Sequence, residues 1–260
     1  MNNVATAILL TAVAGLSTGL GGLFAFFSRK MNTKFLSFTL GISAGVMIYI
    51  SFAELLVSAN TGLAEIYGER IGAIFNAVAF FSGILLVAVV DKLIPDVEIS
   101  QSINSESKRK NGLMHTGIIT AMALGIHNFP EGMATFVSAL GSPAMALPIV
   151  CAIAIHNIPE GIAVAVPIFY ATGNRKKAFL YSLFSGLAEP VGAIIGYLIL
   201  MPFMNDTINN IVFSVVAGIM VFISVDELLP AAHDYGESNL SVFGFVLGMA
   251  VMAISLIGFI

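Results

Sequence analysis

The sequence predicts an all-α polytopic membrane protein of eight transmembrane helices, and three observations carry this prediction. Of its 260 residues, 58% are hydrophobic and only 10% are charged, whereas a soluble domain carries about 25% charged residues. Eight separate apolar runs are each long enough to span a bilayer. The Lys and Arg residues lie almost entirely in alternate connections between those runs, as expected for positively charged cytoplasmic loops.

The eight segments can be placed along the chain because a transmembrane helix needs about 20 apolar residues. We expect them at Val4–Phe27, Phe35–Val57, Ile71–Ile94, Leu113–Leu140, Met145–Phe169, Ala178–Phe203, Ile208–Leu229 and Leu240–Ile260. Together they form a single transmembrane domain over residues 1–260. Its one long connection, about 95–111, is rich in Ser, Asn, Glu and Lys and is expected to be a flexible, solvated loop.

The positive charges orient these segments in the membrane. The first, third and fifth connections carry Arg29, Lys30, Lys34, Lys92, Lys108, Arg109, Lys110, Arg175, Lys176 and Lys177, and only Arg70 lies on the other side. Because Lys and Arg favour cytoplasmic loops, these connections are predicted to be cytoplasmic and both termini to lie outside. The lipid bilayer is then the main partner of the surface. The lack of a basic face excludes nucleic-acid binding, and the single Cys151 excludes an internal disulfide.

Two polar hexapeptides interrupt the apolar runs of the fourth and fifth segments. They read His127-Asn128-Phe129-Pro130-Glu131-Gly132 and, 29 residues later, His156-Asn157-Ile158-Pro159-Glu160-Gly161. An acidic residue at the centre of a membrane helix costs about 2.5–3.5 kcal/mol. Repeating the same polar order twice at this depth therefore calls for a ligand that compensates the cost.

Helical geometry brings the polar side chains of each hexapeptide together. In the first copy His127 and Glu131 are four residues apart and share a helix face, and Asn128 lies within reach of the same carboxylate. Pro130 has no amide hydrogen to donate, so it frees the carbonyl of Ile126. A freed carbonyl at membrane depth is tolerated where it lines a polar cavity. The second copy repeats this arrangement.

A further acid at the same depth completes a candidate metal site. Glu189 lies near the middle of the sixth segment and precedes Pro190. A single buried His or Glu often only bonds a neighbouring helix, but the duplicated set with Glu189 favours metal binding. Mixed nitrogen and oxygen ligands suit Zn²⁺, Fe²⁺, Mn²⁺ or Co²⁺, and three carboxylates exceed the charge of one divalent ion. The predicted metal ligands are His127, Asn128, Glu131, His156, Asn157, Glu160 and Glu189.

A second internal repeat relates the second and seventh segments. Residues 44–56 and 217–229 are identical at eight of 13 positions, and the two segments run in opposite directions. Inverted repeats with polar, proline-broken helices at the midplane are typical of alternating-access transporters. The acids of this repeat, Glu54, Asp226 and Glu227, have two interpretations. They are either solvated helix-end carboxylates or transport-path ligands on the outer and cytoplasmic sides.

Eight segments with outside termini, the paired H-N-x-P-E-G motif and the Glu189-Pro190 pair resemble the ZIP family of divalent metal transporters, in its bacterial zinc-uptake (ZupT-like) branch. The resemblance covers essentially the whole chain. It implies a 3 + 2 + 3 helix arrangement and zinc import across the inner membrane, with iron, manganese, cobalt or cadmium (Cd²⁺) also accepted. It further implies a binuclear centre bridged by Glu131 and Glu160, and Glu54 and Glu227 as transport-path carboxylates.

The chain departs from the family at two places. The loop near 95–111 has no His-rich run, which argues against metal sensing there. The second motif has Asn157 where some members place an Asp, which implies a weaker second ion.

Three other functions share part of this ligand set. A passive metal channel would use the same residues, and an efflux carrier would differ only in the direction of flux. An intramembrane metalloenzyme is disfavoured because neither H-E-x-x-H nor E-x-x-H is present, so no catalytic cofactor is expected. Small residues Gly192 and Gly196 in the sixth segment would suit the close packing of a homodimer.

Overall fold

The structure, a computed structural model, describes residues 3–27, 33–92, 106–141, 143–203, 205–235 and 238–258. Every element in these ranges is helical, with π-helical turns at η1 and η3 and a 3₁₀ turn at η2. The elements are α1 (Asn3–Phe27), α2 (Thr33–Ile50), η1 (Ser51–Leu55), α3 (Leu56–Tyr67), α4 (Glu69–Asp91), α5 (Glu106–Gly141), α6 (Pro143–Thr172), α7 (Arg175–Gly186), α8 (Ala188–Leu200), η2 (Met201–Phe203), α9 (Asp206–Ile223), η3 (Ser224–Leu228), α10 (Leu229–Tyr235) and α11 (Ser238–Gly258).

This architecture confirms the all-α membrane class. Seven helical stretches of the described residues are long and apolar enough to cross a membrane, and the fourth predicted segment lies within α5. Many large apolar side chains on these helices are exposed, as lipid-facing residues are. The chain is a multi-pass integral membrane protein.

The predicted end of the second segment at Val57 is wrong. The helix continues through η1 and α3 to Tyr67, where Gly68 ends it with a φ of 82°. The polar residues after Val57 are typical of a loop, but packing against neighbouring helices buries one face of α3. Leu63 is fully buried, and Gly62 packs against the side chain of Asn210 in α9.

Two further boundaries differ from the prediction. α5 begins at Glu106, so residues 106–111 of the predicted flexible loop are helical, and most of the remaining loop lies outside the described residues. The sixth segment is not one helix but two, α7 and α8, which are separated at Leu187. The break lies just ahead of Pro190, which cannot donate to the carbonyl of Gly186.

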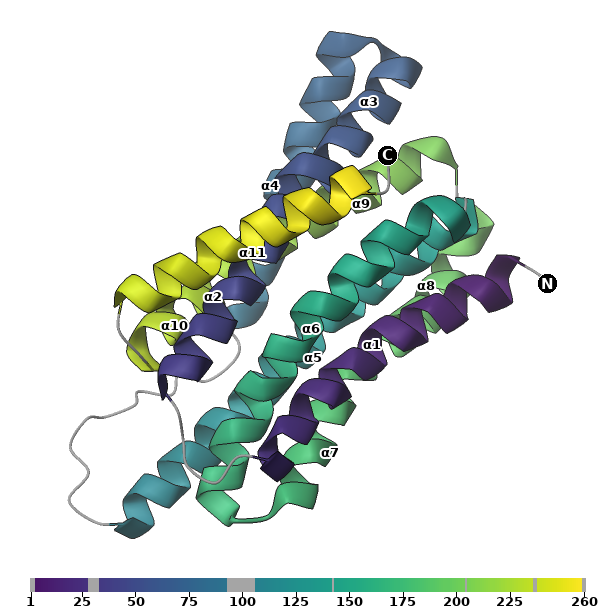
Figure 1. Cartoon of the computed structure of the whole chain (residues 1–260). Coiled ribbons are helices and arrows are strands. Elements are labelled where there is room, and N and C mark those ends of the chain that lie inside the picture. Colours follow the sequence, from purple (N-terminus) through teal and green to yellow (C-terminus); the bar gives the residue numbers. More distant parts are fainter. Residues whose placement is uncertain are drawn as a thin grey trace.

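The helices pack as two bundles, and the 3 + 2 + 3 arrangement stays a prediction. One bundle contains α1, α5, α6, α7 and α8, and the other contains α2, α3, α4, α9, α10 and α11 (Figure 1). Contacts between the bundles are fewer and run mainly from α2 to α6 and from α5 to α9. We call the first the site bundle and the second the outer bundle.

Matching glycines let the helices of the outer bundle approach closely. A Cβ on Gly45 of α2 would collide with the carbonyl oxygen of Phe245 in α11. A Cβ on Gly218 of α9 would collide in the same way with the carbonyl of Phe80 in α4. Gly45 and Gly218 are equivalent positions of the second repeat, so the repeat extends from sequence to packing.

The same repeat places two equivalent π-helical turns in the outer bundle, η1 and η3. In each turn a serine satisfies a backbone carbonyl four residues earlier. Ser51 Oγ donates to the carbonyl of Met47, and Ser224 Oγ donates to the carbonyl of Met220, both at 2.7 Å. Because π turns inside α-helices are frequent at functional sites, this matched pair singles out the stretches that carry Glu54, Asp226 and Glu227.

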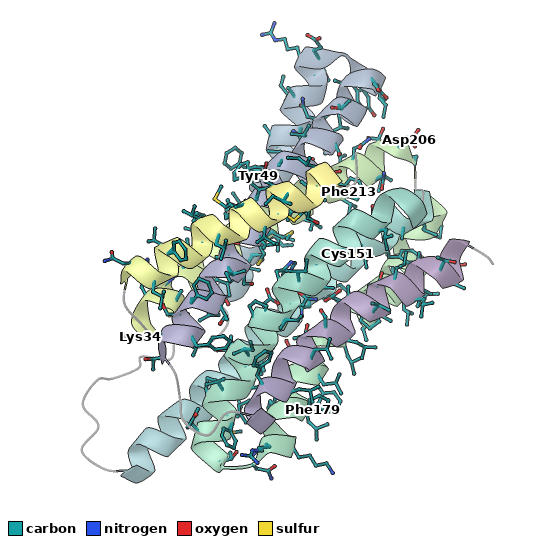
Figure 2. The ribbon with its side chains drawn as sticks, viewed as in Figure 1. Lys34, Tyr49, Cys151, Phe179, Asp206 and Phe213 are labelled. Carbon is teal, nitrogen blue, oxygen red and sulfur yellow. The ribbon has the colours of Figure 1, made fainter. Side chains whose placement is uncertain are left out.

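The two repeat copies run in opposite directions in the structure. Lys34, near the start of α2, and Asp206, at the start of α9, lie toward opposite ends of the molecule (Figure 2). The start of α1 and the end of α11 both lie toward the end of the molecule that carries the α3–α4 turn (Figure 1). The repeat is therefore inverted, as the sequence predicted.

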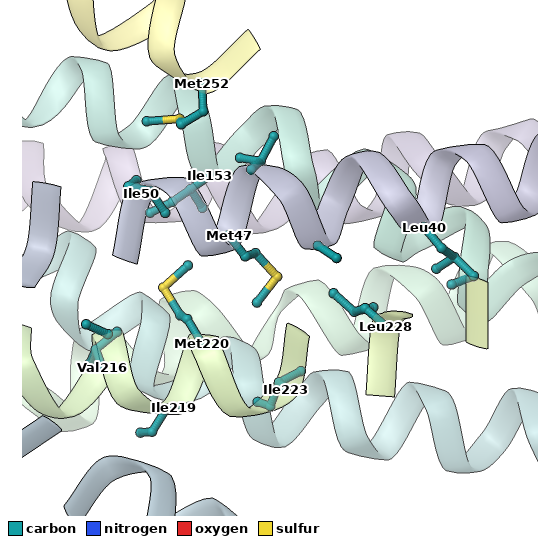
Figure 3. Packing of buried hydrophobic residues seen from close by; sticks show 14 of the residues in the cluster. Leu40, Met47, Ile50, Ile153, Val216, Ile219, Met220, Ile223, Leu228 and Met252 are labelled. Atoms are coloured by element: carbon teal, nitrogen blue, oxygen red, sulfur yellow. The ribbon is translucent and has the colours of Figure 1, made fainter. Parts of the chain in front are cut away.

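The contact between the bundles is mainly apolar. Figure 3 shows Ile50 and Met47 of α2, Met220 of α9 and Ile153 of α6 within one buried cluster. Met47 and Met220 have at most 2% of their surface exposed and serve as packing residues. Among the described residues one side-chain hydrogen bond is found between α2 and α6, in which Ser43 Oγ donates to the carbonyl of His156 at 3.4 Å. Few directional contacts would therefore have to break if one bundle slid along the other.

Candidate metal site

Six of the seven predicted metal ligands have described side chains, and all six are buried inside the site bundle. No more than 2% of any of them is exposed. They are Asn128 and Glu131 on α5, His156, Asn157 and Glu160 on α6, and Glu189 on α8. The seventh, His127, lies on α5, and its side chain is outside the described part of the structure.

The two hexapeptides meet face to face. His156 Nε2 of the second copy lies 3.0 Å from Glu131 Oε1 of the first, with both side chains buried. The imidazole of one repeat thus contacts the carboxylate of the other. This contact joins α5 to α6, and helical spacing within a single segment did not predict it.

Glu189 joins the pair from α8. Its Oε1 accepts a hydrogen bond from Asn157 Nδ2, and the same amide group donates to the carbonyl of Ala14 in α1 at 3.1 Å. Asn128 Nδ2 on α5 donates to the carbonyl of Ser185 in α7 at 3.3 Å. Each motif asparagine therefore has a backbone partner on a neighbouring helix, Asn157 on α1 and Asn128 on α7.

The described side chains contact one another in pairs rather than as a closed cage. Among them, no three His, Cys, Asp or Glu groups form a ready metal cluster. The amides of Asn128 and Asn157 add oxygen atoms to these groups, and the side chain of His127 lies outside the described part of the structure. The predicted binding of metal by these residues stays a prediction, and the structure establishes their burial and their pairwise contacts.

Buried polar atoms in this bundle have unused bonding capacity. A buried polar atom without a hydrogen bond costs about 1–3 kcal/mol and is uncommon in proteins. Five such atoms have no hydrogen-bond partner: Thr18 Oγ1, Asn128 Oδ1, Asn157 Oδ1, Ser185 Oγ and Glu189 Oε2. All five are oxygens able to bind a cation or a water ligand of a cation, which fits the chemistry of the predicted substrate.

The glycine that ends each hexapeptide lets the backbone of a neighbouring helix pack directly against it. A Cβ on Gly132 would collide with the carbonyl oxygen of Glu189, and a Cβ on Gly161 would collide with that of Thr18. The helices therefore approach closely at both glycines, α8 at Gly132 and α1 at Gly161.

We expect Gly132→Ala to destabilise the protein, because the carbonyl of Glu189 cannot retreat without moving α8. The expected loss is about 1–3 kcal/mol, the usual range for overpacking. Gly125→Ala on the same helix is the matched control, since a Cβ there meets nothing within 4 Å. Thermal unfolding of both variants in one detergent measures the difference, and equal midpoints would contradict the close contact.

Two glycines of the sixth segment already pack against another helix of the same chain. Gly192 packs against the carbonyl of Phe129, and a Cβ on Gly196 would lie 3.0 Å from Met133 Cγ. Both contacts are to α5. The prediction that these glycines form a homodimer face is therefore wrong, because α5 of the same chain occupies that face.

The three predicted transport-path acids lie in the outer bundle, away from the site helices. Glu54 is half-buried in η1 and accepts a hydrogen bond of 3.3 Å from Ser58 Oγ. In η3, Asp226 is exposed and Glu227 is half-buried. None of the three shares a bundle with the buried ligands, so a moving ion would pass from one bundle to the other.

A cavity of about 10 Å³, close to the space one water needs, connects these parts. Its lining includes Glu131 from the site bundle and Leu55 of η1, with Ile50 and Met220 from the two repeat copies. The apolar part of the Glu131 side chain therefore borders a small apolar space that reaches the first π turn.

The predicted ligands include no residue of α1, so the contribution of this helix to the site was not predicted. α1 supplies the carbonyl of Ala14 and the buried hydroxyl of Thr18. The available signal was the density of small residues in Gly15-Leu16-Ser17-Thr18-Gly19-Leu20-Gly21-Gly22, which marks a helix that others approach closely.

Known proteins that are similar to this chain are zinc transporters. The family model described as "ZIP Zinc transporter" matches residues 95–256. The protein named zinc transporter ZupT from Streptococcus mutans is 56% identical over 258 residues, which is 98% of each chain. Proteins of the same name from Oceanobacillus iheyensis and Clostridium perfringens are 53% and 52% identical over at least 98% of each chain.

Proposed function

Because this chain belongs to the ZIP family of zinc transporters, we propose that it carries divalent transition-metal ions, zinc foremost, across the bacterial inner membrane into the cytoplasm. ZIP proteins are transporters, which sets aside the metalloenzyme alternative. Iron, manganese and cobalt share the same ligand chemistry and are included as substrates.

The observation that carries this proposal is the burial of the duplicated polar set. Glu131, Glu160 and Glu189 lie with His156 and both motif asparagines inside a bundle of membrane-spanning helices. Ionisable groups at this depth are costly and mark ion pathways. Three carboxylates can neutralise more than one divalent ion, so we assign this set to a binuclear centre in which Glu131 and Glu160 bridge two ions.

Alternating access would follow from movement of the site bundle against the outer bundle. Every predicted ligand lies in the former, whereas Glu54, Asp226 and Glu227 lie in the latter. With both termini outside, the ion would arrive past Glu54 and leave past Asp226 and Glu227. The apolar contact between α2, α6 and α9 would let the bundles shift, and the inverted repeat provides two mirrored states.

Zinc influx into proteoliposomes that hold a trapped zinc dye tests the proposed function. A carrier predicts saturable influx that depends on the membrane-inserted protein and is absent from protein-free vesicles. Influx that rises linearly with zinc up to high concentration would favour a channel. Zinc binding without any influx would overturn the import proposal and favour efflux.

A further inference from the structure

The contacts of α1 with the site repeat those of α7 and α8. Asn157 donates to the carbonyl of Ala14, and Asn128 donates to the carbonyl of Ser185. A Cβ on Gly15 would collide with the carbonyl of Gly186, and a Cβ on Gly186 would collide with that of Gly15. The two stretches therefore meet each other through matching atoms, as two halves related by a two-fold axis do.

The motif glycines fix the register of this relation. Gly132 packs against the carbonyl of Glu189, whereas its equivalent Gly161 packs against the carbonyl of Thr18. The next pair agrees, because Gly192 contacts the carbonyl of Phe129 and Gly21 contacts the carbonyl of Ile158, the matching motif position. The equivalent residues of α1 and of α7 or α8 are Ala14 and Ser185, Gly15 and Gly186, Thr18 and Glu189, and Gly21 and Gly192. The two members of every pair are separated by the same number of residues along the chain. Thr18 is therefore the structural equivalent of Glu189.

Side-chain positions follow the same relation. A Cβ on Gly15 would lie 3.2 Å from the Cβ of Glu189, and a Cβ on Gly186 would lie 2.7 Å from the Cβ of Thr18. Since Glu189 bonds Asn157, the equivalence directs Thr18 toward the side of Asn128. Thr18 Oγ1, Asn128 Oδ1 and Ser185 Oγ are all buried and have no hydrogen-bond partner.

We propose that the Thr18 hydroxyl is a further member of the metal site, which holds a water ligand of the transported cation together with Asn128 and Ser185. A glutamate extends its oxygens two bonds farther from the backbone than a threonine does. Where Glu189 reaches the ion directly, Thr18 stops short by roughly the length of one hydrogen bond, about 2.7 Å. One water fills that gap and satisfies the unpaired oxygens.

This arrangement makes the two halves of the site chemically unequal. The half built on Asn157 and Glu189 is anionic, and the half built on Asn128 and Thr18 is neutral. The cation is therefore held directly on one side and remains partly hydrated on the other. A threonine in place of a fourth carboxylate also limits the negative charge of the site, which favours release of the ion.

Thr18→Val tests the inference, because it removes the hydroxyl and retains the branched shape. The inference rests on the proposed function, so zinc binding to the purified protein is measured by calorimetry for wild type, Thr18→Val, Thr18→Ser and Glu189→Gln. We expect Thr18→Val to weaken one binding event about tenfold, the lower end for groups that support metal ligands, and Thr18→Ser to restore it. The visible spectrum of bound Co²⁺ should change for Val and not for Ser.

The controls separate the possible failures. Thr11→Val is the matched variant on α1, since Thr11 is also buried but its hydroxyl donates to the carbonyl of Ala7. If Thr18→Val fails to fold, Thr18→Ala replaces it. If wild type binds no zinc, or Glu189→Gln changes nothing, the proposed site fails. If Glu189→Gln weakens binding while the Thr18 variant keeps both affinities and the Co²⁺ spectrum, only the inference is overturned.

Discussion

Glu131→Gln is expected to lower saturable zinc influx into proteoliposomes by about tenfold to a hundredfold or more. The substitution keeps the size of the side chain and removes the charge that faces His156 at 3.0 Å. It takes one carboxyl group from a buried set of three, and divalent cations need negative charge in surroundings where water cannot screen it. The measurement is the initial rate of dye response against external zinc.

Two comparisons make this result specific. Glu65→Gln alters an exposed acid on α3 and is expected to leave influx at the wild-type rate. Glu160→Gln changes the equivalent position of the second hexapeptide and should reproduce the loss. If both motif variants are inserted and folded and still transport zinc at the wild-type rate, the two glutamates do not belong to the transport site.

A covalent link between the two bundles is expected to stop transport and to release it on reduction. Ile50 on α2 and Ile153 on α6 border the same small cavity from opposite bundles, and Figure 3 shows them in one cluster. Cysteines at both positions, in a background where the single native Cys151 is replaced by Ser, can be oxidised to a disulfide. Because alternating access requires the bundles to shift, oxidation should reduce influx to the level of protein-free vesicles.

A link inside one bundle is the matched control. Phe38 on α2 and Phe243 on α11 stack with ring centroids 6.1 Å apart, and both belong to the outer bundle. Cysteines at these two positions should form a disulfide without slowing influx. Full transport through the cross-bundle disulfide would instead show that the ion passes without bundle movement, as in a channel.

Much of the candidate site could be predicted from the sequence because its chemistry is repeated. His-Asn-x-Pro-Glu-Gly occurs twice in apolar surroundings, so polar groups that must be compensated stand out without any structure. The helix ends were less predictable. The polar residues beyond Val57 look like a loop, yet α3 buries Leu63 and packs against Asn210 through Gly62. Local composition carries no information about a neighbour that arrives from a distant part of the chain.

The sequence by itself determined the membrane class, the approximate positions of most segments, the inverted repeat and the buried polar residues of the two hexapeptides. Each of these depends on hydropathy, charge or periodicity, which are local properties. Tertiary structure alone decided which segments form a bundle, that His156 contacts Glu131, and that Thr18 occupies the place equivalent to Glu189. These features depend on how backbones approach one another at small residues, and such contacts join positions that no local pattern connects.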